Sequence, residues 1–441
     1  MRRFLAVAAL VALCAGRAFG REPALPAAQT GEIRVARIRL VTPRYEYVWN
    51  ESGGEFEGEF EGEQEDGPKA GLSPSAILTW TGLRPGRTMS AKAFDREVHR
   101  TERRLSDSGL FYSVSVRVTP PLRKPSERTV VITVSDGFPH RFSGGNAYAM
   151  YGRKALGGNR ASAFAYAGWN LLGFEYAHEN LGNRGYTIEA AFFSRDYLPS
   201  RYGVDDAEPR NDLYVRAGKF LSPDVSVAAG PALVAVADAH DREWSFIPSC
   251  EAVLRVDRLG LTPVEARWTL DSRAAWFPLD GAWKLRSSGT FTSVMAGGAG
   301  AGKPEGPRAE FFLSGSAGWM PEDAPGAIAF RLYDAEDVSV RSGYADAELT
   351  LTSYAFLSSE LRFDLGTFGF RPGLAVVPQL FLFGDAAVPA PGPAWDGTVL
   401  EALGAGARMK FPAPVCTDFT FSWGTNREGN WRFSLYARAG T

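Results

Sequence analysis

The residues of this sequence that could carry out covalent chemistry are few, and their spacing is poor for it. The segment GGAGAGKP at 297–304 begins like a phosphate-binding loop, but Pro304 stands where a Ser or Thr would hold magnesium. No buried-strand pattern precedes it and no helix pattern follows, so a Gly-rich loop is the better interpretation. The chain has no Cys-x-x-Cys pair, and its four histidines are too scattered for a metal site, at positions 99, 140, 178 and 240. We therefore expect no enzyme activity, catalytic residue, metal or cofactor.

One arginine has a more specific context, in the segment VSVRSGYADAEL at 338–349. Arg341 comes just before Gly343 and Tyr344, and an alternating segment, YAFLSSELRF, follows at 354–363. By itself this pattern indicates a loop with a hairpin turn, in which Arg341 is exposed. A charged side chain of this kind would need an acidic partner wherever it is buried, because an unpaired buried charge is costly.

The elements that would position such a residue are strands. From about residue 139 onward, segments of roughly ten residues alternate between apolar and polar positions, as in GYTIEAAFF (185–193) and LYVRAGKF (213–220). Charges fall inside these segments, and no run of 18 or more apolar residues follows residue 20. This pattern predicts a transmembrane β-barrel of more than a dozen strands at about 9–11 residues each. An aqueous β-sandwich is the alternative.

The end of the sequence favours the barrel. Phe419, Phe421 and Trp423 occupy every second position, and TNREGN at 425–430 forms a turn. The alternation then resumes with Trp431, Phe433 and Leu435, separated by Arg432 and Ser434. We expect the apolar side chains to face lipid and the polar ones to face the lumen. A long apolar last strand suits a barrel, because its first and last strands pair and leave no edge.

The beginning of the sequence has the pattern of an export signal. Residues 1–20 begin with Arg2 and Arg3, followed by an apolar run and by small residues at a cleavage site. A lipoprotein signal at Cys14 is the alternative, and either would take the chain out of the cytoplasm. Residues 21–31 are expected to be a linker. Sequence does not show whether Cys250 and Cys416 pair.

Residues 32–138 predict a separate α+β module. A strand at 33–40 is followed by a short helix that Ser73 caps, a longer helix at about 91–107, and two further strands. Within the module, residues 48–72 are an acidic insert with Glu at every odd position from 55 to 65. We expect a disordered, solvated loop there, with binding of basic partners or cations as the alternative. The net charge of −2 argues against a nucleic-acid partner.

Several of these segments resemble one family, the BamA-like outer-membrane assembly factors of Gram-negative bacteria, also called the bacterial surface antigen family. The resemblance rests on GLRPGRTMSAKAFDREVHRTERRLSDSGLFYSVSVRV (82–118), VVITVSDG (130–137), VRSGY, and the closing segment at 404–440. Residues 82–137 look like the family's polypeptide-transport-associated (POTRA) repeat. The chain departs from the family pattern at Ser342, inserted in the Arg-Gly-Tyr element, and at Thr441, where an aromatic residue is usual.

The resemblance implies a mostly β protein. A POTRA domain at 32–138 would lie in the periplasm, and a transmembrane antiparallel barrel of about 16 strands would occupy 139–441 in the outer membrane. Arg341, Gly343 and Tyr344 would form a motif on a loop folded into the lumen, and Arg341 would lock the loop and barrel conformation.

The resemblance also implies a function in inserting outer-membrane proteins or translocating polypeptides. An incoming strand would be templated at a lateral seam between the first and last strands. Seam residues would be Gly144, Gly145, Trp431, Phe433 and Leu435, and the paired glycines would weaken the ladder. Partners would be unfolded outer-membrane or secreted polypeptides and outer-membrane lipid, with periplasmic accessory proteins as a further class. A passive pore or a surface structural protein of the same fold is the alternative.

Overall fold

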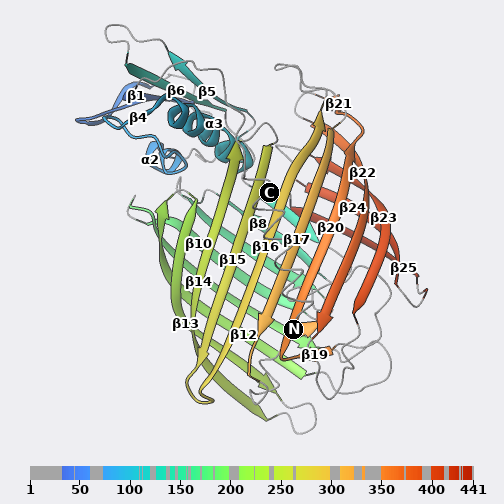
Figure 1. The fold of residues 1–441 in the computed structure, drawn as a ribbon. Coiled ribbons are helices and arrows are strands. Elements are labelled where there is room, and N and C mark those ends of the chain that lie inside the picture. Colours follow the sequence, from blue (N-terminus) through green and yellow to red (C-terminus); the bar gives the residue numbers. More distant parts are fainter. Residues whose placement is uncertain are drawn as a thin grey trace.

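The computed structural model consists of a small α+β module followed by a large β-barrel (Figure 1). It describes residues 32–43, 45–59, 73–108, 110–111, 113–119, 126–135, 140–144, 148–154, 156, 160–168, 171–181, 184–197, 208–222, 224–237, 243–261, 265–297, 308–321, 330–332, 349–371, 374–389, 399–411, 417–426, 429 and 431–439. The predicted signal peptide at 1–20 and the linker at 21–31 lie outside this set.

The module is built on a mixed sheet with the order β3-β2-β1-β6-β5, and β4 also pairs with β1. Strands β1 and β6 are parallel, and the other pairs are antiparallel. The bounds of its elements are β1 Glu32–Val41, β2 Tyr45–Asn50, β3 Gly53–Glu59, α2 Pro74–Leu78, β4 Thr88–Ser90, α3 Ala91–Asp107, β5 Val114–Thr119 and β6 Glu127–Val134. No described helix is long or apolar enough to cross a membrane.

Both helices begin where the sequence predicts. The hydroxyl of Ser90 accepts a hydrogen bond from the backbone N–H of Ala93 at 3.3 Å, so it caps α3. Ser73 caps α2 in the same way, by accepting from the backbone N–H of Ala76, and α2 ends at Leu78.

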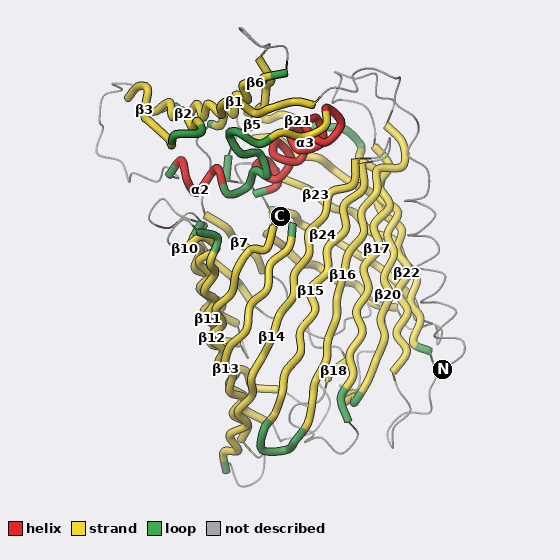
Figure 2. Tube along the Cα trace, turned by 60° about the vertical axis from the view of Figure 1, so that its left-hand side comes forward, coloured by secondary structure: helices red, strands yellow, loops and turns green. Residues whose placement is uncertain are grey.

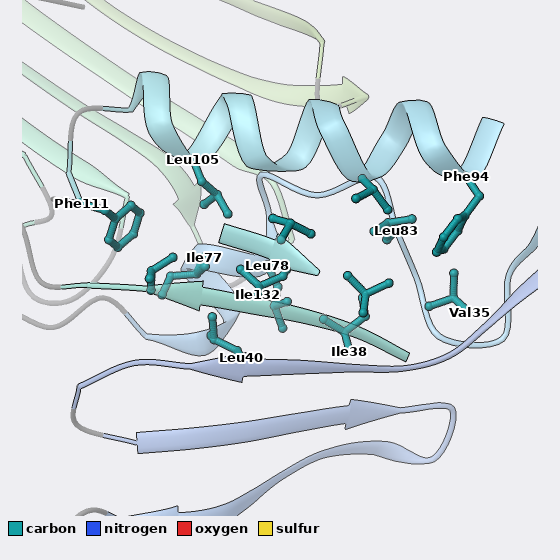
Figure 3. Packing of buried hydrophobic residues seen from close by; sticks show 14 of the residues in the cluster. Val35, Ile38, Leu40, Ile77, Leu78, Leu83, Phe94, Leu105, Phe111 and Ile132 are labelled. Atoms are coloured by element: carbon teal, nitrogen blue, oxygen red, sulfur yellow. The ribbon is translucent and has the colours of Figure 1, made fainter. Parts of the chain in front are cut away.

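One apolar face of α3 packs on the sheet and forms the core of the module (Figure 3). Phe94 and Leu105 on α3 meet Ile38, Leu40 and Ile132 from the central strands, and all five side chains are almost fully buried. The helical spacing of Phe94 and Leu105 and the alternation in the strands therefore meet in one core.

The acidic insert differs from the sequence expectation. Its first part continues β2 and forms β3, and these strands pair as a hairpin that extends the sheet from β1. The prediction of a disordered loop is therefore wrong for residues 48–50 and 53–59. Alternating residues at 45–49, Tyr-Glu-Tyr-Val-Trp, explain why a strand forms there. Residues 60–72 lie beyond the described part of the insert.

Strands of the barrel run from residue 140 to residue 439. Their bounds are β7 His140–Gly144, β8 Tyr148–Arg153, β9 Ala161–Gly168, β10 Leu171–Leu181, β11 Tyr186–Tyr197, β12 Glu208–Ser222, β13 Val225–Ala237, β14 Trp244–Leu261, β15 Glu265–Phe277, β16 Ala282–Gly297, β17 Arg308–Trp319, β20 Ser353–Asp364, β21 Phe368–Arg371, β22 Leu374–Pro389, β23 Leu400–Phe411, β24 Thr417–Asn426 and β25 Trp431–Ala439. Two short strands, β18 Phe330–Leu332 and β19 Leu349–Leu351, form a separate hairpin.

Sixteen described strands close the barrel. They follow the order β10 to β17, β20, β22 to β25, and then β7 to β9, all antiparallel, while β21 pairs only with the beginning of β22. The predicted fold, an antiparallel barrel of about 16 strands preceded by a small α+β domain, is confirmed. The module lies at one end of the barrel, with α2 and α3 on the side of its sheet that faces the strands (Figure 2).

Side chains alternate between the outside of the barrel and its lumen. In β24, Phe419 and Trp423 are exposed on the outside, whereas Thr420 and Ser422 are buried, as the sequence predicts. Phe246, at 62% exposure, shows the same outward apolar face on β14. Soluble proteins rarely expose contiguous apolar surface of this kind, so the outer face is suited to lipid.

Candidate functional site at the barrel seam

The seam between the last strand, β25, and the first, β7, is the weakest junction of the barrel. In the described part of the chain these strands share one register pair, Ala437 with Gly144. On its other side β25 pairs with β24 over nine positions, from Thr417 with Ala439 to Thr425 with Trp431. Most of β25 therefore has a sheet neighbour on one side only.

The seam is weak because the first strands are short. Strands β7, β8 and β9 have five, six and eight residues, whereas about 9–11 residues are needed to cross the hydrocarbon layer. A five-residue strand cannot cover the nine-residue edge of β25.

The predicted seam residues do not all lie between β25 and β7: one glycine pairs across the seam, and the three apolar residues lie on the outer face of β25. Gly144 lies at the seam and pairs with Ala437, while Gly145 is outside the described residues. Trp431, Phe433 and Leu435 lie on the seam strand, and their side chains are exposed at 62%, 63% and 41%. Their positions oppose Thr425, Trp423 and Phe421 of β24, so they extend the outer apolar face rather than contact β7.

A first network of ion pairs lines the lumen on β11, β12, β14 and β15. Arg216 is buried and donates through Nε to Glu251 at 2.9 Å, and its Nη1 lies 3.6 Å from Glu189. Arg255 donates to Glu189 at 2.9 Å and to Asp271 at 3.2 Å. Each carboxylate thus meets a guanidinium group from another strand, which offsets the cost of burying charge.

A second network lies on β17, β20 and β23. Glu360 accepts from Arg362 at 2.6 Å and from Arg408 at 3.4 Å, and Arg408 also donates to Thr420 at 3.2 Å. Lys410 and Glu310 approach to 3.9 Å. The sequence reasoning did not single out these residues, although charges at every second position, such as Glu360 and Arg362, were a signal for them.

An apolar cluster fills the lumen at the barrel end away from the module. Phe330, on the β18–β19 hairpin, is fully buried and packs against Tyr354 with ring centroids 5.0 Å apart. The other members come from the far ends of the wall strands and the segment after β17: Val234, Val236, Ile247, Ala275, Phe277, Met320, Ala387, Leu400 and Ala402. We call this set the mouth cluster. A packed apolar cluster in this position presents a water-repelling surface to the lumen, the kind of surface at which channels gate by dewetting.

Two arginines join the module to the near end of the barrel. The guanidinium group of Arg160, before β9, lies 4.3 Å from the Trp80 ring centroid and 5.1 Å from that of Phe220, and it donates to Thr79 at 3.1 Å. Arg104 on α3 donates to Asp224, in the β12–β13 turn, at 2.5 Å. On the module side these contacts come from α3 and the residues just after α2. On the barrel side they come from Arg160, the end of β12 and the β12–β13 turn.

Other sequence candidates are not brought together. Arg341, Gly343 and Tyr344 lie outside the residues that the structure describes, so their place in the lumen stays a prediction. Gly297 ends β16, and the rest of the Gly-rich segment is likewise not described. Cys250 is exposed on the outer face of β14 as a free thiol, and Cys416 falls outside the described set. Within the described residues, no group of three or more His, Cys, Asp or Glu could hold a metal ion.

Comparison with known proteins gives matches in structure but not in sequence. No protein-family model and no curated protein matches the chain. BamA from Haemophilus ducreyi lacking POTRA domains 1–3 aligns with a TM-score of 0.47 and 11% identity over 92% of this chain and 84% of that chain. CdiB from Acinetobacter baumannii aligns with a TM-score of 0.53 and 11% identity over 83% of this chain and 71% of that chain. CdiB from Escherichia coli gives 0.52 and 13% over 83% and 73%. The chain thus has the fold of the two CdiB structures.

Proposed function

We propose that this protein inserts or translocates polypeptides at the outer membrane of a Gram-negative bacterium, and that it does so by templating a strand at the β25–β7 seam. The observation that carries the proposal is the single register pair between Ala437 and Gly144. An incoming extended segment could add to the edge of β25 by β-augmentation, in which backbone hydrogen bonds provide the affinity.

The bilayer supplies the driving force for such pairing. A backbone N–H or C=O that lacks a partner in hydrocarbon costs several kcal/mol, so an uncovered strand edge in lipid favours a new neighbour. Among the described residues, opening the seam further requires the loss of one register pair, whereas separation of β24 from β25 would break nine. The seam is therefore the place where the barrel opens at the lowest cost.

The remaining parts have supporting roles in this proposal. The N-terminal module would act as a POTRA domain in the periplasm and guide unfolded outer-membrane or secreted polypeptides, with accessory proteins as further partners. Outer-membrane lipid would contact the outer apolar face. The chain would work by binding and templating, without covalent chemistry, cofactor or metal.

A disulfide lock across the seam tests the proposal directly. Gly144→Cys with Ala437→Cys, in a Cys250→Ser and Cys416→Ser background, would place two thiols at the one seam register pair. The matched control is Ser422→Cys with Ser434→Cys, a register pair inside the β24–β25 ladder. In vesicles, the oxidised seam variant should fail to fold an added client barrel, as followed by heat-modifiable gel mobility, and reductant should restore it. Full activity of the locked seam would contradict the proposal.

The passive pore that the sequence leaves open is tested separately. Because the mouth cluster gathers apolar side chains at one end of the lumen, we expect dewetting there and no steady conductance from the wild-type protein in planar bilayers. Depletion of the protein from cells should also lower the folded fraction of other outer-membrane barrels. A large steady conductance together with normal folding of those barrels would favour the pore.

A further inference from the structure

A groove of about 1450 Å³ crosses the outer face of the barrel, away from the seam, over β12 to β17 and the adjoining ends of β20 and β22. Ordinary pockets for small molecules have volumes of roughly 300–1,000 Å³, so this one suits a larger or longer ligand. Strands lie about 4.8 Å apart, so a groove that crosses several of them runs along the wall for a few tens of ångströms.

The floor of the groove is a row of alanines in direct cross-strand register. Ala217 pairs with Ala229, Ala229 with Ala252, and Ala252 with Ala274. These residues lie on the outer face, since the neighbouring positions Arg216, Glu251 and Arg273 belong to the lumen side. Larger outward side chains such as Leu254, Leu285 and Trp319 border the row. The row is therefore hollow because its side chains are short.

The two ends of the groove differ in charge. At the end nearest the module, Lys219 lies on the outer face, and its Nζ is 5.0 Å from the ring centroid of Tyr186. Lys219 is three residues from the end of β12 at Ser222, close to the turn that meets α3. A lysine at this depth can extend its ammonium group to the headgroup region.

Acidic side chains of the same strands face the other way. Glu189, Glu251 and Asp271 belong to the first lumen network, where they pair with arginines. The groove thus presents a cation at one end and an apolar floor along its length. This pattern is complementary to an anionic phospholipid, whose negative phosphate would meet the cation and whose acyl chains would lie on the apolar floor.

We propose that the groove binds an anionic phospholipid of the periplasm-facing leaflet, with its acyl chains along the Ala217–Ala274 row and its phosphate at Lys219. The site is separate from the seam; its assignment to the periplasm-facing leaflet rests on the proposed function's placement of the module in the periplasm, but not on strand templating. Its contribution would be to keep a bound lipid on the wall opposite the region where strands enter.

Native mass spectrometry of the full chain in detergent tests this proposal, with phosphatidylglycerol and phosphatidylcholine of identical acyl chains as probes. The wild-type protein should retain phosphatidylglycerol in preference to phosphatidylcholine. Lys219→Ala should lower that preference about fivefold, which is the change in affinity that the loss of one exposed ion pair produces. Ala252→Phe should fill the floor and reduce retention of both lipids. Ala405→Phe, on the outer face of β23 and outside the groove, is the matched control.

Each outcome decides for or against the lipid. Equal retention by the wild-type, Ala252→Phe and Ala405→Phe proteins would overturn the proposal, as would a phosphatidylglycerol preference that survives Lys219→Ala. If Ala252→Phe instead converts a dimer to a monomer, the occupant is a second copy of the chain and the lipid assignment fails. Heat-modifiable mobility verifies that each variant is folded, and Lys219→Ala tests the headgroup contact even if the floor variant does not fold.

Discussion

At the residue scale, Glu360 shows how the lumen holds charge. It is 5% exposed and meets both Arg362 and Arg408, so one carboxylate serves two guanidinium groups from β20 and β23. Loss of one member of a buried ion pair leaves an uncompensated charge, whereas loss of an exposed pair costs little. The position of a pair in the wall therefore decides its contribution to stability.

We predict that Glu360→Gln lowers the free energy of unfolding by about 3–5 kcal/mol, because two buried arginines lose their counter-charge. Urea unfolding of the barrel in lipid vesicles measures the change. The control is Asp257→Asn, whose pair with Arg267 at 2.6 Å is half exposed, and this variant should change stability by no more than about 1 kcal/mol. Equal losses in the two variants would argue against the network as a source of stability.

A second prediction at this scale concerns Arg341, which sequence alone singles out. If its loop enters the lumen, Arg341→Ala removes a charge that pairs with the inner wall, and the protein should lose client-folding activity or unfold at lower urea. Both quantities can be measured in the vesicle assay. An unchanged activity together with an unchanged urea midpoint would support the alternative of an exposed loop arginine.

At the element scale, the contacts between α2, α3 and the barrel turns determine where the module sits. Arg160 lies between two aromatic rings, one from the module and one from the barrel, and this arrangement joins segments that are far apart in the chain. A cation–π contact contributes about 0.5–2 kcal/mol, depending on its desolvation. The module is thus held by a small number of specific contacts.

We predict that Arg160→Ala loosens the module, because both ring contacts and the hydrogen bond to Thr79 are lost. Limited proteolysis should release the module several times faster than in the wild-type protein. Arg84→Ala is the control, since Arg84 lies 5.2 Å from the Trp49 ring and so makes a similar contact entirely within the module. Faster release in the control but not in Arg160→Ala would contradict the docking role.

At the scale of the whole molecule, the far end of the lumen and the β25–β7 seam differ in how many residues hold neighbouring strands together. The mouth cluster packs side chains from several strands around Phe330, whereas the wall at the seam rests on Ala437 with Gly144. In the described part of the chain, packing is therefore dense at the far end of the lumen and sparse at the β25–β7 seam. The proposed strand templating would use the sparsely paired side of the barrel.

We predict that Phe330→Ala gives a steady conductance in planar bilayers that the wild-type protein lacks, because removal of the buried ring opens the mouth cluster. Truncation of a buried Phe also costs about 3–5 kcal/mol of stability. Phe94→Ala, in the core of the module, controls for the loss of stability and should not conduct. An unchanged current for Phe330→Ala would show that other residues close the lumen.

The sequence by itself determined the class of fold, because the spacing of apolar residues along the chain shows which face of each strand or helix is apolar. Alternation with Phe419 and Trp423 on one side and Thr420 and Ser422 on the other predicts a strand with one face in lipid. The helix predicted at about 91–107 likewise matches α3, whose start Ser90 caps through a local contact. The hairpin β2–β3 was missed, because the abundance of Glu and Gly at 51–66 outweighed the alternation at 45–49.

Only the tertiary structure decided which distant residues meet. Nothing local shows that Ala437 pairs with Gly144 of β7, because register at closure depends on the length and tilt of the strands of the whole barrel together. The same holds for Glu189 with Arg255, for the alanine row and for Phe330 in the lumen. Local pattern specifies the face on which a residue lies, and closure of the barrel specifies its neighbour, because the partner comes from a strand that can be hundreds of residues away.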